Sequence, residues 1–186
     1  MVSPVISERM SAEQFLEWEE KQPDKHEFIE GKIYTMVGVT RQHAAVTGNI
    51  FSWLLQHLRG TRCRVYVADM KLKLEAADAF FYPDVFVTCS ESDHQAERYM
   101  TESRLIIEIL SESTEAYDRG YKFEKYRQFS SLVEYTLINP LRQKAEIFRK
   151  EGGGQWVLYE FCKDEAVYFA SLELTIEHAA LYENVD

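Results

Sequence analysis

This 186-residue sequence has no long apolar run and no leader-like start. The stretch VTGNIFSWLLQHL is interrupted by polar residues, so it falls short of the roughly 18 consecutive apolar residues that a membrane span needs. The first residues, MVSPVISERM, lack a positively charged start followed by an apolar segment, and therefore predict no secretory signal. We expect no association with a membrane.

Cysteine is also scarce. The three cysteines, Cys63, Cys89 and Cys162, are an odd number and widely spaced, and they form no CxxC pair. The sequence contains no HExxH motif and no cluster of cysteine and histidine. This pattern argues against a disulfide framework and against a thiolate zinc site, and it favours a reducing, cytoplasmic location.

Positive charge is in deficit, because 21 lysines and arginines face 31 acidic residues and give a net charge of −10. Such a field opposes nonspecific binding to polyanions, so a nucleic-acid partner would require a local basic patch or a divalent cation. The length suits one domain with a real core, and we predict a single domain over residues 1–186.

Hydrophobic periodicity predicts an α/β fold with a mixed central sheet flanked by helices. A first helix is expected within 9–21, with Ser11 as its N-cap, and a longer helix over 41–58. A further helix is expected at 116–129. Strands or hairpins are expected at 26–38, 64–74, 85–87, 104–110, 133–140 and 144–161. The last of these is a hairpin around three consecutive glycines, which makes the C-terminal end rich in β-structure.

One charged residue interrupts the most apolar of these strands. Glu108 lies within LIIEIL, and an unpaired buried carboxylate would cost roughly 3–5 kcal/mol. It shares its strand face with Ile106, Leu110 and Arg104. Two interpretations remain open from the strand alone: a structural glutamate, for example one paired with Arg104, or a functional acid that binds a metal ion.

A second acid and a lysine favour the functional interpretation. Asp84 follows Pro83 at the start of another apolar strand, and two carboxylates on neighbouring strands can hold one magnesium ion. Lys122 falls on the helix face expected to pack on the sheet, where it could stabilise a phosphate undergoing attack. The alternative for Lys122 is a structural ion pair with Asp118, four residues earlier.

Six segments resemble a known family: HEFIEGKIYTM, RQHAAVTGNI, YPDVFVTC, LIIEILSEST, DRGYKFEKY and LVEYTLINP. They recur in this order in the Uma-two family, which belongs to the PD-(D/E)XK restriction-endonuclease-like superfamily, and the resemblance covers residues 24–161. It implies a restriction-endonuclease-like αβββαβ core, here with an extra C-terminal β-hairpin, and the ancestry of a metal-dependent phosphodiesterase.

Carried over residue by residue, the resemblance implies that Asp84 and Glu108 bind Mg²⁺ or Mn²⁺. The superfamily pattern places a lysine two residues after the second acid, where this chain has Leu110. The resemblance implies that Lys122 replaces it from the following helix. Glu27 matches an acid that the family carries before its first long helix, as a third ligand or as a group that supports the ligands.

The resulting hypothesis is a metal-dependent endonuclease that hydrolyses phosphodiester bonds in DNA, and the resemblance is compatible with a homodimer. The alternative is a catalytically inactive module of the same fold that binds nucleic acid or protein, which the acidic charge and Leu110 favour. A small-molecule hydrolase ranks last, because no pocket signal supports it. His43 remains open between a core histidine and a group near the site, since it lies on the apolar stripe of its helix.

Overall fold

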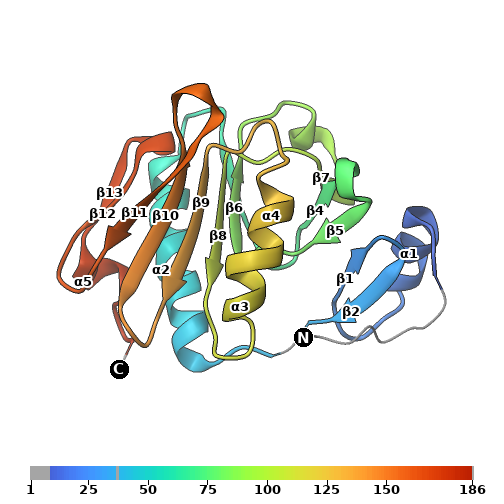
Figure 1. The fold of residues 1–186 in the computed structure, drawn as a ribbon, viewed down its shortest axis with the longest axis horizontal. Helices are drawn as coiled ribbons and strands as arrows, with labels where there is room; N and C mark the ends of the chain where they lie inside the picture. The colour runs from blue at the N-terminus through green and yellow to red at the C-terminus, as the bar shows by residue number, and fades with distance from the viewer. Residues whose placement is uncertain (1–8, 37, 186) are drawn as a thin grey trace.

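The computed structural model describes residues 9–36 and 38–185. Two β-sheets lie side by side, and a helical segment packs between them (Figure 1). The larger sheet has six strands in the order β11-β10-β9-β8-β6-β3, and the smaller has five in the order β2-β1-β5-β4-β7. The predicted α/β class is therefore confirmed, although the strands divide between two main sheets.

The strands of the larger sheet are β3 (Arg64–Val67), β6 (Val85–Thr88), β8 (Leu105–Ile109), β9 (Glu134–Asn139), β10 (Lys144–Lys150) and β11 (Trp156–Phe161). Those of the smaller sheet are β1 (His26–Ile29), β2 (Lys32–Thr35), β4 (Lys71–Leu74), β5 (Ala79–Phe81) and β7 (Tyr99–Met100). A separate hairpin consists of β12 (Val167–Phe169) and β13 (Leu174–Ile176).

The principal helices are α1 (Ala12–Glu19), α2 (Arg41–His57), α3 (Glu115–Tyr117), α4 (Phe123–Tyr126) and α5 (His178–Leu181). A π-helix, η3 (Asp118–Lys122), joins α3 to α4. Short 3-10 turns are η1 (Glu75–Ala77), η2 (Asp93–Gln95), η4 (Gly152–Gly154) and η5 (Ala170–Leu172). Within the described ranges, no helix is both long and apolar enough to cross a membrane.

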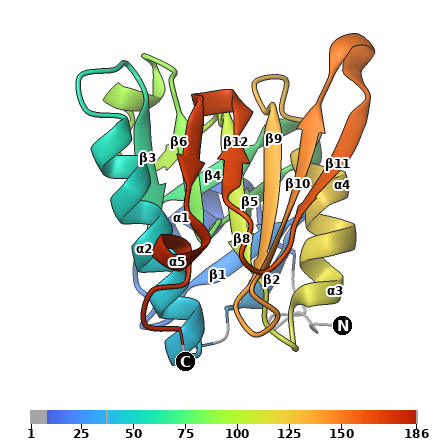
Figure 2. The ribbon, with the colours of Figure 1, turned by 90° about the vertical axis from the view of Figure 1, so that its left-hand side faces the viewer.

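The larger sheet is mixed, because β8 and β9 are parallel while its other neighbouring strands are antiparallel. Figure 2 shows α2 and the β12–β13 hairpin in front of this sheet, and the α3–α4 segment on the other side of it. The order α2, β3, β6, β8, α3–α4 and β9 reproduces the expected αβββαβ core.

Apolar periodicity explains how α2 attaches to this sheet. Thr40 caps the helix by accepting a hydrogen bond from the backbone of His43, and Val46, Ile50 and Leu54 then follow at helical spacing. All three are fully buried against alternate residues of β8. Full burial of such a side chain contributes about 1.5–3 kcal/mol, so packing rather than helix propensity fixes this element.

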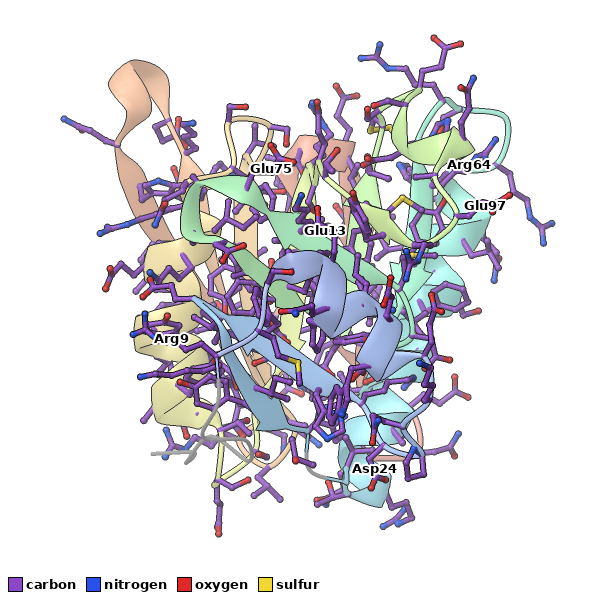
Figure 3. The ribbon with its side chains drawn as sticks, turned by 90° about the vertical axis from the view of Figure 1, so that its right-hand side faces the viewer. Arg9, Glu13, Asp24, Arg64, Glu75 and Glu97 are labelled. Carbon is purple, nitrogen blue, oxygen red and sulfur yellow. A yellow bond between two sulfur atoms is a disulfide. The ribbon has the colours of Figure 1, made fainter. Side chains whose placement is uncertain are left out.

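The smaller sheet carries α1 on its outer face, as Figure 3 shows from that side. Ser11 and Gln14 form a capping box at the start of α1, which confirms the predicted N-cap. Phe15 of this helix stacks on Phe28 of β1, with ring centroids 5.1 Å apart. The tight β1–β2 turn places Gly31 at a φ of +84°, a conformation that favours glycine.

The structure contradicts the expectation that the cysteines form no disulfide, because Cys63 and Cys89 are bonded. Arg64 pairs with Thr88 in the β3–β6 ladder, so the next residues outward face one another with Cα atoms 4.0 Å apart. A separation of 26 residues hid this pairing from an argument based on sequence spacing. Cys162 is free and exposed.

Two further expectations need correction. The helix predicted over 116–129 is not a uniform α-helix, because the π-helix interrupts it and α4 ends at Tyr126. The expected C-terminal hairpin exists as β10–β11, but it extends the larger sheet. The second hairpin, β12–β13, which packs on this sheet, was not predicted.

Candidate active site

Two carboxylates meet where β6 begins and β8 ends. Val85 pairs with Ile107 across the antiparallel ladder, which places the preceding Asp84 beside Glu108. The backbone amide of Asp84 donates to Glu108 Oε2 at 3.3 Å, and the amide of Ile109 donates to Asp84 Oδ2 at 2.8 Å. The two acids that the sequence singled out are thus brought together and held by each other's strands.

Lys122 enters this site from the π-helix. Its Nζ lies 3.0 Å from Glu108 Oε1, 3.2 Å from Glu27 Oε1 and 3.4 Å from Asp118 Oδ1. The ammonium is therefore surrounded by carboxylates from β8, from β1 of the smaller sheet and from its own helix. The ion pair with Asp118 that the sequence allowed is present, and the same ammonium also contacts Glu108 and Glu27.

Two tyrosines complete the arrangement. Tyr126 donates to Glu108 Oε1 at 2.9 Å, and Tyr117 donates to Glu27 Oε2 at 3.0 Å. Sequence reasoning missed both as site residues, since an aromatic residue at helical spacing is usually core. The available signal was their spacing from Lys122, four residues after it and five before it.

Burial sets the electrostatics of the cluster. It raises the pKa of the Glu108 carboxyl well above its usual value, although Lys122 pulls in the opposite direction. Burial also raises the pKa of Asp118, again against the attraction of Lys122. For Lys122, burial lowers the pKa, but Glu108 and Glu27 outweigh it and hold the pKa well above its usual value. The lysine stays charged, and three carboxyl groups contact this one ammonium.

His43 belongs to this site rather than only to the core. Its Nε2 lies 3.2 Å from Asp84 Oδ2, and its Nδ1 lies 3.4 Å from Thr47 Oγ1 on the next turn of α2. The sequence left open whether His43 is a core histidine or a group near the site, and this contact places it beside Asp84. The first turn of the long helix orients the imidazole toward the same carboxylate oxygen that the Ile109 amide contacts.

Other sequence alternatives are wrong. Arg104 does not pair with Glu108, because its Nε donates to the carbonyl of Ser171 at 2.8 Å. Asp69, in the turn between β3 and β4, forms an ion pair with Lys25 and is largely exposed.

The donor chemistry of the site suits a hard divalent cation. Carboxylate oxygens are the ligands that magnesium prefers, and one or two of them with water and a substrate phosphate are enough. Glu27 Oε1 is buried and, within the described part of the chain, lacks a hydrogen bond despite the nearby ammonium. Among these residues, no set of three or more histidine, cysteine, aspartate or glutamate side chains forms a preformed metal cage. The residues present therefore suit a divalent cation held by two carboxylates, with water and substrate as its other ligands.

The αβββαβ core, with paired acids on its central strands and a lysine beside them, defines a protein of the restriction-endonuclease-like class. The chain belongs to the Uma2 family, whose model, described as "Putative restriction endonuclease", matches residues 12–180.

Known proteins are similar over nearly the whole chain. "Uncharacterized protein slr1290" of Synechocystis sp. is 30% identical over 177 residues, which cover 95% of this chain and 93% of that protein. "Uncharacterized protein sll1609" of the same organism is 32% identical over 159 residues, covering 84% and 90%. A crystal structure from Anabaena variabilis ATCC 29413, described as "a putative nuclease belonging to DUF820", superposes with a TM-score of 0.76 at 20% identity, covering 95% of this chain and 99% of that one.

Proposed function

We propose that this protein is an endonuclease that uses Mg²⁺ or Mn²⁺ to hydrolyse phosphodiester bonds in DNA. The observation that carries the proposal is the convergence of Glu27, Asp84, Glu108 and Lys122 in one cluster at the junction of the two sheets. The family's description and the fold of the Anabaena protein support a nuclease in the coarser sense.

Charge balance supports the cation. Glu27, Glu108 and Asp118 surround a single ammonium, and Asp84 adjoins Glu108. Buried acids in excess are costly unless a cation or a proton neutralises them. In this proposal Asp84 and Glu108 hold the ion. When bound, a divalent cation supplies Lewis-acid stabilisation of the charge that develops on the phosphate.

The protein's own groups then have distinct tasks. Lys122 is a fixed donor and positive charge that can stabilise a phosphate oxygen or orient the attacking water. Glu27 holds the lysine from the side of the smaller sheet, and Tyr117 in turn fixes Glu27. His43 orients the carboxylate of Asp84.

A cleavage assay tests the proposal. Purified protein is incubated with supercoiled plasmid and with single-stranded DNA, in Mg²⁺, in Mn²⁺ and in EDTA. We expect cation-dependent nicking or cutting that falls by more than about 100-fold in Asp84→Asn and in Glu108→Gln, as is typical when a transition-state contact is removed. Asp69→Asn is the control, because this acid lies in the turn that hydrogen-bonds to Asp84 but is exposed and paired elsewhere.

The outcomes separate the two hypotheses. Cleavage that persists in both site variants would exclude this site as the catalytic one. No cleavage by the unaltered protein, together with cation-independent binding of DNA or protein, would instead support the inactive module. DNA as the substrate, the homodimer and the cytoplasmic location remain predictions. Sedimentation of the purified protein measures the dimer, and the Cys63–Cys89 bond makes the thiol state in cells a direct test of location.

A further inference from the structure

The π-helix creates an arrangement that a regular α-helix would not allow. Tyr117 and Lys122 are five residues apart, and in an α-helix they would point about 140° away from each other. The i to i+5 hydrogen bonding of a π-turn brings such residues to the same face. Here both contact Glu27, and the Lys122 Nζ lies 5.6 Å from the centre of the Tyr117 ring.

Asp118 is the first residue of this π-turn, and it is nearly fully buried. Its carboxylate lies 3.4 Å from the Lys122 ammonium. Its backbone is fixed at both ends, because its amide donates to the carbonyl of Thr114 at 2.9 Å and its carbonyl accepts from the Tyr135 hydroxyl at 2.9 Å. The carboxylate is therefore a rigid anchor on the same helix as the lysine.

The other two carboxylates around Lys122 are less able to serve as its anchor. Glu108 is shared with Tyr126 and is the acid that a divalent cation would engage under the proposed function. Glu27 belongs to β1, on a different sheet, and also accepts a hydrogen bond from Tyr117. A cation beside Glu108 repels the ammonium and weakens its hold there. Asp118 then remains as the partner that moves with the lysine.

We propose that Asp118 is the positioning residue that keeps the Lys122 ammonium in the site when a divalent cation engages Glu108. This inference rests on the proposed function, because it assigns Asp118 to the machinery of the same site. The π-turn orients the Lys122 side chain toward Glu27 and Glu108, and the Asp118 carboxylate holds its ammonium in position. Together they place a lysine from the helical segment beside Glu108, whereas the strand position two residues after Glu108 holds Leu110.

The first test observes the lysine directly and needs no activity. Protein labelled with ¹⁵N-lysine is examined by NMR, where a buried ammonium that exchanges slowly with water gives a separate signal. Lys122→Arg, which removes that signal, assigns it. We expect the signal to persist when the unaltered protein is titrated with Ca²⁺. In Asp118→Asn, it should vanish or shift to the position of exposed lysines upon addition of Ca²⁺.

Glu115→Gln is the matched control, because Glu115 makes a comparable i,i+4 pair with Arg119, at 2.8 Å, on the same helical segment. It should leave the Lys122 signal unchanged. Circular dichroism checks that each variant is folded, and Asp118→Glu, which keeps the charge, should restore the signal at least in part. A Lys122 signal that persists with Ca²⁺ in Asp118→Asn would overturn the proposal.

The second test separates positioning from metal binding. Asp118→Asn should lower kcat by about 100-fold, the order of loss expected from a misplaced catalytic group, while KM and the Ca²⁺ dissociation constant change less than about threefold. A large loss of Ca²⁺ affinity would instead make Asp118 a metal ligand and refute the positioning role. If the unaltered protein cleaves nothing, the proposed function fails, but the NMR comparison still decides whether Asp118 holds Lys122.

Discussion

Replacing Lys122 by methionine removes the charge from the centre of the acidic cluster but keeps most of the side-chain volume. Three carboxylates contact the ammonium, and only 9% of the lysine side chain is exposed. Removing one partner of a buried ion pair typically costs about 3–5 kcal/mol, because the remaining charge stays buried without compensation. For a chain of this size, we expect a fall in Tm of about 6–20 °C at pH 7 without divalent cations.

The pH dependence of this loss follows from the raised pKa values of Glu108 and Asp118. A raised folded-state pKa stabilises the protein fully below the unfolded pKa, and the stabilisation disappears as the pH rises through the folded pKa. In Lys122→Met, Glu108 and Asp118 lose the neighbouring ammonium, so both carboxyl groups take up protons more readily. The destabilisation should therefore shrink as the pH falls below 7, and Mg²⁺ at pH 7 should restore part of the lost stability.

Lys125→Met is the matched control on the same helical segment. Lys125 forms an ion pair with Glu30, at 3.1 Å, and the Glu30 side chain is 63% exposed, so solvent screens the pair. Exposed pairs contribute about 0.2–1 kcal/mol, which corresponds to a few degrees of Tm at most. Thermal and urea unfolding in EDTA measure both variants. Equal losses for the two would refute the conclusion that the Lys122 ammonium neutralises a buried acidic cluster.

Three further measurements address other parts of the structure. The stabilisation by Mg²⁺ should grow as the pH rises, because burial raises the pKa of Glu108 and this carboxyl must lose its proton to bind a cation; a shift in Tm that does not change with pH would contradict this assignment. Replacing Cys63 and Cys89 by serine should cost about 3 kcal/mol in oxidising buffer and nothing in reducing buffer, with Cys162→Ser as the neutral control. Glu134→Gln should cost about 3 kcal/mol, because it neutralises a buried acid that binds an arginine and two backbone amides; a loss below about 1 kcal/mol would show that these contacts are dispensable.

The elements that carry the site were predictable because each has a strong local pattern. The apolar run around Glu108 predicts a buried strand, and the stripe of Val46, Ile50 and Leu54 predicts an amphipathic helix; the structure has both. The juxtaposition of Asp84 with Glu108 followed from the expectation that their strands are neighbours, which the β6–β8 ladder confirms. For the strand and for the helix, the residues that decide the local structure are close in sequence.

What the sequence concealed depends on contacts between distant segments. The Cys63–Cys89 bond depends on the register of β3 against β6, which no spacing rule reveals. The contact between His43 and Asp84 requires the start of α2 to lie beside the start of β6. The π-turn was missed because amphipathic patterns are analysed with a period of 3.6 residues, whereas this segment aligns residues five apart.

The surroundings of Leu110 explain why this strand position disfavours a lysine. Its side chain is almost fully buried in the core between the larger sheet and the α3–α4 segment, with Ile106 and Tyr126. A lysine at 110 would have to bury its charge among these apolar groups or displace the helix that covers them. Tyr126, on the helical segment that covers Glu108, donates a hydrogen bond to Glu108 Oε1. Lys122 lies one turn earlier on the same segment, and its ammonium contacts the same oxygen. The packing of the α3–α4 segment on the larger sheet therefore accounts both for the apolar residue at position 110 and for the position of Lys122 beside Glu108.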